Sequence, residues 1–114
     1  MKDKTEARIQ QEIFMWFKNN FCLNHHSPKN LIFSVPNDSS SKEETMRKLA
    51  TGMLAGASDL IIVQPNKITF VEIKTATGVQ SDVQKQFQKD VESLGFEYKL
   101  IRSLENFQQF VKTC

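Results

Sequence analysis

The sequence has few of the features that mark exported, membrane-spanning or metal-thiolate proteins. Its first twelve residues, MKDKTEARIQQE, are charged and lack the apolar core of a secretory signal. No apolar run approaches the roughly 18 residues that span a bilayer. Only two cysteines occur, Cys22 and Cys114, and their wide separation fits no metal-ligand spacing. We therefore expect a cytoplasmic protein with reduced thiols and no membrane partner.

The chain also lacks a large excess of charge of either sign. Fifteen Lys and Arg residues against thirteen Asp and Glu residues give a formal net charge of +2. This balance excludes a strongly basic protein that coats polyanions, so any contact with nucleic acid must be a local patch. Because 39% of the residues are hydrophobic, including nine Phe, the 114 residues should fold as one domain spanning 1–114.

The spacing of apolar residues predicts two helices and a strand in the first half of the chain. Apolar positions recur at helical intervals over 5–18, and the polar stretch 19–29 predicts a loop. The segment LIFSVP at 31–36 predicts a short strand that ends at its proline. A second helix is expected over roughly 42–54, ending at the glycines of TGMLAGAS.

The second half begins with a predicted β-hairpin, DLIIVQPNKITFVEIK, over 59–74. Both faces of its two runs are apolar, so we expect them in the middle of a sheet that is covered on both sides. A helix from Ser81 to Gly95, a strand over 96–101 and an amphipathic helix over 104–111 follow. The order α-β-α-β-β-α-β-α predicts a single α/β domain with a central mixed sheet flanked by helices.

Polar side chains at helix starts and apolar side chains on helix faces complete this interpretation. Thr5 is a suitable N-cap for the first helix, one of Ser39–Ser41 for the second, and Ser81 for the third. We assign Met46 and Met53, together with the aromatic stripe of the first helix, to the core.

Three polar residues, Asp59, Glu72 and Lys74, interrupt the apolar hairpin. If Gln64 and Lys67 flank a two-residue turn, antiparallel pairing sets Asp59 opposite Glu72, with Cβ atoms roughly 4.5–5.5 Å apart. Two carboxylates at that distance repel each other unless a cation such as Mg²⁺ binds them. Lys74 projects from the same face. A turn of odd length would shift this register by one residue.

A structural interpretation of the same residues stands beside the metal site. Asp59 could simply begin a strand, while Glu72 and Lys74 form a cross-strand pair on the surface. However, Glu72 follows the run ITFV, which has the composition of a buried strand, and a buried carboxylate needs a partner.

The segments GMLAGASDLIIV, ITFVEIKTATG and SDVQKQF carry the ordered pattern G-x-x-D, E-x-K, S-x-x-Q. In this the sequence resembles the virus-type replication-repair nuclease (VRR-NUC) domains of the PD-(D/E)xK phosphodiesterase superfamily. The resemblance runs from about Thr5 to Val111 and includes SVPND at 34–38, which looks like a strand end common in phage-encoded members. One departure is Ser58, which stands where the family usually has proline before its acidic residue.

The resemblance implies a restriction-endonuclease-like core and a DNA endonuclease that depends on Mg²⁺ or Mn²⁺. It implies that Asp59, Glu72 and the main-chain carbonyl of Ile73 bind the metal, and that Lys74 orients or polarises the attacking water and the phosphate. Gln84 matches the helix glutamine of the family.

A glutamate on the first helix usually completes the family's site, and both Glu6 and Glu12 are candidates. Helical periodicity places Glu6 on the same stripe as the apolar residues, which favours Glu6. Its alternative role is that of a first-turn acid favoured by the helix dipole.

The resemblance further implies a homodimer acting on branched DNA, in the cytoplasm of a bacterial or phage-infected cell. The main alternative is a catalytically silent module that binds nucleic acid or a protein partner on the same fold. A restriction-type enzyme that reads a base sequence would need a recognition insertion, for which this chain has little room. The remaining histidines and basic residues are expected to be solvated, with phosphate contact as the alternative: His25, His26, Lys42, Arg47, Lys48, Lys85 and Lys89.

Overall fold

The computed structural model describes residues 4–36 and 40–112, and its elements follow the predicted order. Ser39, Asn37, Asp38 and Cys114 lie outside the described residues. No helix within the described ranges is long and apolar enough to cross a membrane. The elements are α1 (Glu6–Phe21), β1 (Leu31–Ser34), α2 (Lys42–Ala50), β2 (Leu60–Gln64), β3 (Lys67–Ile73), α3 (Asp82–Ser93), β4 (Glu97–Ile101) and α4 (Leu104–Lys112).

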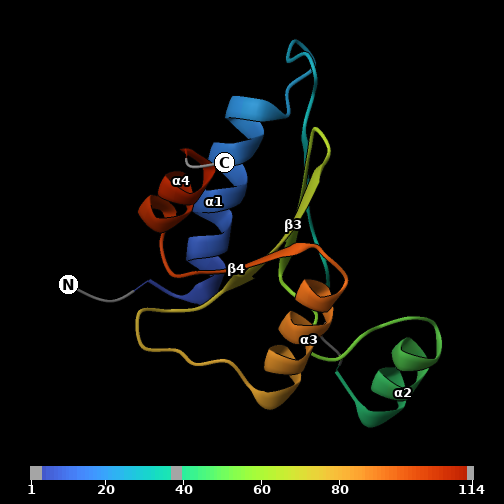
Figure 1. Ribbon diagram of the computed structural model, residues 1–114. Helices are drawn as coiled ribbons and strands as arrows, with labels where there is room; N and C mark the ends of the chain where they lie inside the picture. The colour runs from blue at the N-terminus through green and yellow to red at the C-terminus, as the bar shows by residue number, and fades with distance from the viewer. Residues whose placement is uncertain (1–3, 37–39, 113–114) are drawn as a thin grey trace.

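The four strands form one mixed sheet in the order β1-β2-β3-β4. Strands β1, β2 and β3 are antiparallel to their neighbours, whereas β4 runs parallel to β3. Helices α1 and α4 lie together on one side of the sheet, and α3 lies on the other (Figure 1). The predicted α/β class, with the hairpin strands in the centre, is confirmed.

Helix α1 begins as predicted and ends later. The Thr5 side chain accepts a hydrogen bond from the Arg8 N–H, which confirms the N-cap. The helix continues three residues beyond 18 to Phe21. Aromatic packing accounts for the extra turn, because the rings of Phe17 and Phe21 lie 4.8 Å apart within the core layer.

Helix α2 is shorter than predicted and contributes nothing to the core. Ser41 is its N-cap, and the helix ends at Ala50 because Gly52 adopts φ +116°, which breaks the helical path. No residue of α2 is buried, and Met46 is 63% exposed, so its assignment to the core is wrong. Figure 1 shows α2 beside α3 at the edge of the molecule.

The two faces of the central hairpin are covered unequally. On the α1 and α4 side, Leu60, Ile62, Val71 and Ile73 are fully buried. On the α3 side, Phe87 covers β3 and β4. Its ring centre lies 5.6 Å from that of Phe70 and 6.1 Å from that of Tyr98. The prediction that both faces are covered therefore holds only under α3. The rest of that face is partly exposed: Leu31, Phe33, Ile61, Val63 and Ile68.

Candidate active site

The predicted register of the hairpin is confirmed. Leu60 pairs with Val71 and Gln64 with Lys67, across a two-residue turn in which Asn66 has φ 57°. Continued by one residue, this register brings Asp59 to Glu72. Asp59 Oδ2 accepts a hydrogen bond of 2.7 Å from the backbone N–H of Ile73, so its carboxylate is fixed at the end of β3.

Glu72 is the chemically exceptional residue of the sheet. Its side chain is 1% exposed, and its Oε2 accepts a hydrogen bond of 3.1 Å from Gln84 Nε2. Its Oε1 is buried and accepts no hydrogen bond from the described residues. Burial, followed by the charge of Asp59 and a hydrogen bond with that carboxyl group, raises the pKa of Glu72 to about 8. At neutral pH this group therefore holds a proton, and a bound cation would favour the carboxylate by taking the place of that proton.

Lys74 lies two residues after Glu72 and is only 9% exposed. Its backbone N–H donates to the carbonyl of Ile101 at 3.0 Å, which extends the ladder between β3 and β4 and fixes its position. The Lys74 charge lowers the pKa of Glu72, against the larger raising effects. Because both side chains are buried, the interpretation of Glu72 and Lys74 as a surface pair is wrong.

The capping box of α3 aims Gln84 at Glu72. Ser81 Oγ accepts from the Gln84 N–H at 3.3 Å, and Gln84 Oε1 accepts from the Ser81 N–H at 2.9 Å. With its amide oxygen committed to the cap, the Gln84 amide nitrogen is left to donate to Glu72. The S-x-x-Q spacing is thus both a helix start and a site contact.

Gly56 and Ser58 determine how the chain approaches Asp59. Gly56 has φ +83°, and a Cβ there would lie 2.4 Å from the carbonyl oxygen of Val83, so only glycine allows the loop to pack against α3. Ser58 is 1% exposed, and its hydroxyl donates to the carbonyl of Leu60 at 3.3 Å. This local bond stabilises the start of β2.

Arg102 is a residue of the site region that sequence reasoning missed. Its Nη1 donates to the carbonyls of Thr75 at 2.6 Å and Gly78 at 2.7 Å, which closes the loop that follows Lys74. The acceptors are main-chain atoms, so no side-chain pattern in the sequence could have indicated this contact.

The two candidate glutamates of α1 have different surroundings. Glu12 pairs with Lys4 at 2.9 Å and Arg8 at 3.3 Å, and these contacts lower its pKa. Glu6 is exposed at the start of the helix rather than buried on its apolar stripe, yet its charge contributes a minor part of the rise in the pKa of Glu72. Of the two, Glu6 therefore stays the predicted helix acid of the site, because Glu12 is paired with Lys4 and Arg8.

The donor set fits a divalent cation through two carboxylates. Asp59 and Glu72 are adjacent, both offer hard oxygen atoms, and Glu72 Oε1 is buried without a donor. Within residues 4–36 and 40–112, no three His, Cys, Asp or Glu side chains are placed to hold a metal ion together. Glu6 is thus not grouped with the pair, and its role as a metal ligand remains a prediction.

The other polar residues singled out from the sequence lie elsewhere. His25 and His26 stack 4.3 Å apart in the loop between α1 and β1, where His26 Nδ1 accepts from the Leu23 N–H. On the exterior helices, Lys48 pairs with Glu44 at 2.8 Å, while the remaining basic residues are exposed: Lys42, Arg47, Lys85 and Lys89.

The mixed sheet and the flanking helices define an α/β fold with acidic residues at the ends of the two central strands. A solved structure described as a VRR_NUC domain protein shares it with a TM-score of 0.77 and 19% sequence identity. The match covers 99% of this chain and 89% of the other. The chain therefore has the VRR-NUC fold, as its motifs predicted. No protein-family model and no curated protein matches the sequence.

Proposed function

We propose that this protein is a metal-dependent endonuclease that hydrolyses DNA phosphodiester bonds. The observation that carries the proposal is the buried Glu72, with its unpaired Oε1, between Asp59 and Lys74 at the end of β3. The cofactor would be Mg²⁺ or Mn²⁺, held by Asp59, Glu72 and the Ile73 carbonyl, with Glu6 at the margin. Branched DNA as substrate, a homodimer as the working unit and a bacterial or phage-infected cytoplasm are further parts of the proposal.

The roles follow from where charge develops. Hydrolysis increases the negative charge on the phosphate and the leaving oxygen; a bound divalent cation stabilises this charge and lowers the pKa of water. Lys74 adds a positive group beside the same carboxylates and is held there by its backbone bond to β4. Gln84 donates a hydrogen bond to Oε2 of Glu72, which would leave Oε1 as the oxygen to bind a cation.

The test is an assay of the purified protein with Mn²⁺ on labelled single strands, duplexes, flaps and four-way junctions. We expect cleavage that EDTA abolishes, with a preference for branched substrates. The variant Lys74→Met should cleave more slowly, and Lys29→Met is its matched control. Lys29 is an exposed lysine whose ammonium group donates to Asn24 at the opposite end of the sheet. Binding without cleavage under every metal condition would instead support the silent module, and cleavage that survives EDTA would contradict the metal site.

A further inference from the structure

Lys74 is buried, although lysine side chains are flexible and are rarely withdrawn from solvent. It is 9% exposed and lies just beyond the end of β3. The segment 75–80 that follows it runs as a loop from β3 to α3 (Figure 1). A Cβ placed on Gly78 of this loop would lie 3.5 Å from Cδ of Lys74, so the loop packs against the lysine stem. The burial of Lys74 therefore depends on where this loop lies.

The guanidinium group of Arg102 fixes the part of the loop that packs on Lys74. Its Nη1 donates to the carbonyl of Thr75 at 2.6 Å and to that of Gly78 at 2.7 Å. The Gly78 N–H also donates to the Thr75 carbonyl, at 3.2 Å. Hydrogen bonds from a charged donor are stronger than those between neutral groups, and both acceptors of Nη1 belong to this one turn. A single side chain thus closes the turn over the lysine.

Arg102 lies beside Lys74 because β3 and β4 run parallel. Ile73 pairs with Ile101, and the Lys74 N–H donates to the Ile101 carbonyl at 3.0 Å. Continued by one residue, this register sets Arg102 next to Lys74. The N–H of Arg102 donates to Asn106 Oδ1 at 3.1 Å, at the start of α4. The main chain of the arginine is therefore fixed on both sides, by the sheet and by α4.

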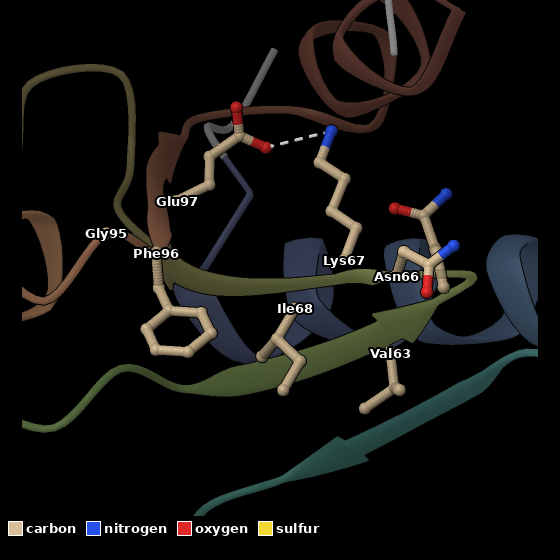
Figure 2. A pocket seen from close by; sticks show the side chains of 8 residues that line it. Val63, Asn66, Lys67, Ile68, Gly95, Phe96 and Glu97 are labelled. Atoms are coloured by element: carbon tan, nitrogen blue, oxygen red, sulfur yellow. Dashed lines mark ion pairs between the residues drawn. The ribbon is translucent and has the colours of Figure 1, made fainter.

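The opposite end of the same strand pair is joined by side chains instead. Figure 2 shows the starts of β3 and β4, where Lys67 and Glu97 form an ion pair of 3.1 Å beside a hollow of about 530 Å³. The candidate site lies at the end of β3, and Arg102 follows the end of β4. The contact between β3 and β4 can therefore be weakened at Lys67 without touching the candidate site.

We propose that Arg102 is a positioning residue for the reaction: by holding the loop 75–78 on Lys74, it keeps the lysine ammonium beside the carboxylates of the site. For its effect on cleavage this inference rests on the proposed function, whereas the hold on Lys74 is a property of the folded chain alone. A displacement of about 1 Å at a reacting group can cost on the order of 10²-fold in rate. Arg102 acts through the loop and needs no contact with DNA or metal.

The first experiment measures the acetylation rate of each lysine by mass spectrometry, without DNA or metal. Lys74 should react more slowly than the exposed Lys29 in wild type, because the loop covers it. Arg102→Met removes the donor, and we expect the acetylation of Lys74 to become at least ~10-fold faster as the loop opens. Lys67→Met breaks the ion pair at the far end of β3 and β4. It is the matched control and should leave the reactivity of Lys74 unchanged.

The second experiment compares single-turnover cleavage in Mn²⁺ by wild type, Arg102→Met, Lys74→Met and the double variant. Arg102→Met should cleave at least ~10-fold more slowly. Its affinity for Mn²⁺ should stay close to that of wild type, because arginine is not a metal ligand. Since Arg102 acts through Lys74, the double variant should be at most ~3-fold slower than Lys74→Met alone. Losses that multiply in the double variant would overturn the positioning role and indicate a separate contact of Arg102 with DNA.

The two readouts separate this inference from the proposed function. If wild type cleaves no DNA with any metal, the nuclease proposal fails, and acetylation still decides whether Arg102 holds Lys74. Unchanged acetylation of Lys74 in Arg102→Met, or cleavage by this variant at the wild-type rate, would overturn the inference and leave the nuclease proposal standing. Circular dichroism checks folding. Should Arg102→Met not fold, Arg102→Lys replaces it, because its shorter side chain keeps the charge but not the reach to both carbonyls.

Discussion

At the scale of single residues, the carboxyl group of Glu72 is held between opposing influences. Burial and Asp59 favour its protonated form, whereas Lys74 favours the carboxylate. The raised pKa of about 8 means that the metal-free protein keeps a proton at this position at neutral pH. A cation must displace that proton to bind, so metal affinity should increase with pH.

The first residue-scale prediction concerns stability without metal. In the unfolded chain, the pKa of Glu72 returns to about 4.5, while in the folded chain it is about 8. Between these values the folded state binds the extra proton, so this group's contribution to stability falls as pH rises, by up to about 1.4 kcal/mol per pH unit. Glu72→Gln should flatten the profile from pH 5 to 8. Urea unfolding across this range measures it, and parallel profiles for the two proteins would contradict the assignment.

The second residue-scale prediction separates the affinity for Mn²⁺ from the rate of DNA cleavage. Lys74→Met should retain Mn²⁺ affinity, because a lysine ammonium is not a metal ligand. It should lower the cleavage rate on the order of 10²-fold or more, which is the scale for loss of one electrostatic group near the transition state. Calorimetric titration with Mn²⁺ measures the affinity, and a single-turnover cleavage assay measures the rate. Turnover close to wild type in this variant would show that Lys74 has no part in the reaction.

At the scale of elements, the capping box at the start of α3 also positions a side chain of the candidate site. Its capping box satisfies the free N–H groups of the first turn and, in the same geometry, turns the Gln84 amide towards Glu72. A glutamate at position 84 could form the same cap, but it would set a third carboxylate against Glu72 and Asp59. The contact with Glu72, and not the helix cap, therefore explains why position 84 is a glutamine and not a glutamate.

This distinction predicts different effects for two substitutions in α3. Ser81→Ala removes the N-cap and should cost about 1 kcal/mol of stability at both pH 6 and pH 9. Gln84→Glu keeps the cap but adds a charge near Glu72, so its cost should be larger at pH 9 than at pH 6. Denaturant unfolding at the two pH values compares them. An equal cost for Gln84→Glu at both values would contradict the contact with Glu72.

At the scale of the whole molecule, the proposed metal, if bound by Asp59 and Glu72, would stabilise the folded chain by mass action, because the unfolded chain does not bring the two residues together. The site joins the start of β2 to the end of β3, so its occupancy should report on global unfolding. In the absence of metal, the same two groups oppose folding whenever both are charged.

Asp59→Asn tests this coupling. Without metal, the variant should be as stable as wild type, or more stable by about 0.5–2 kcal/mol at pH 9, because one of two adjacent charges is removed. An asparagine can still accept from the Ile73 N–H. We expect Mn²⁺ to raise the melting temperature of wild type, and this rise should disappear in the variant. A large loss of stability without metal, or an undiminished Mn²⁺ effect, would make Asp59 a structural residue at the start of β2.

The order of elements, the N-caps and the hairpin register could be predicted from the sequence, because each depends on neighbours close along the chain. The two-residue turn at Pro65 and Asn66 sets the register, and the register places Asp59 beside Glu72. Burial of Glu72 followed from the apolar run before it. These local signals were enough to locate the candidate site.

The contacts that only the tertiary structure decided join segments far apart in sequence. Apolar spacing placed Met46 in the core, but a helix stripe does not specify which surface covers it, and α2 packs outside the sheet. Arg102 closes the loop after Lys74 through main-chain carbonyls, which carry no residue-specific signal. Likewise, the partial cover of the sheet depends on the reach of α3 across four strands, because burial is a property of the packed layers and not of any single strand.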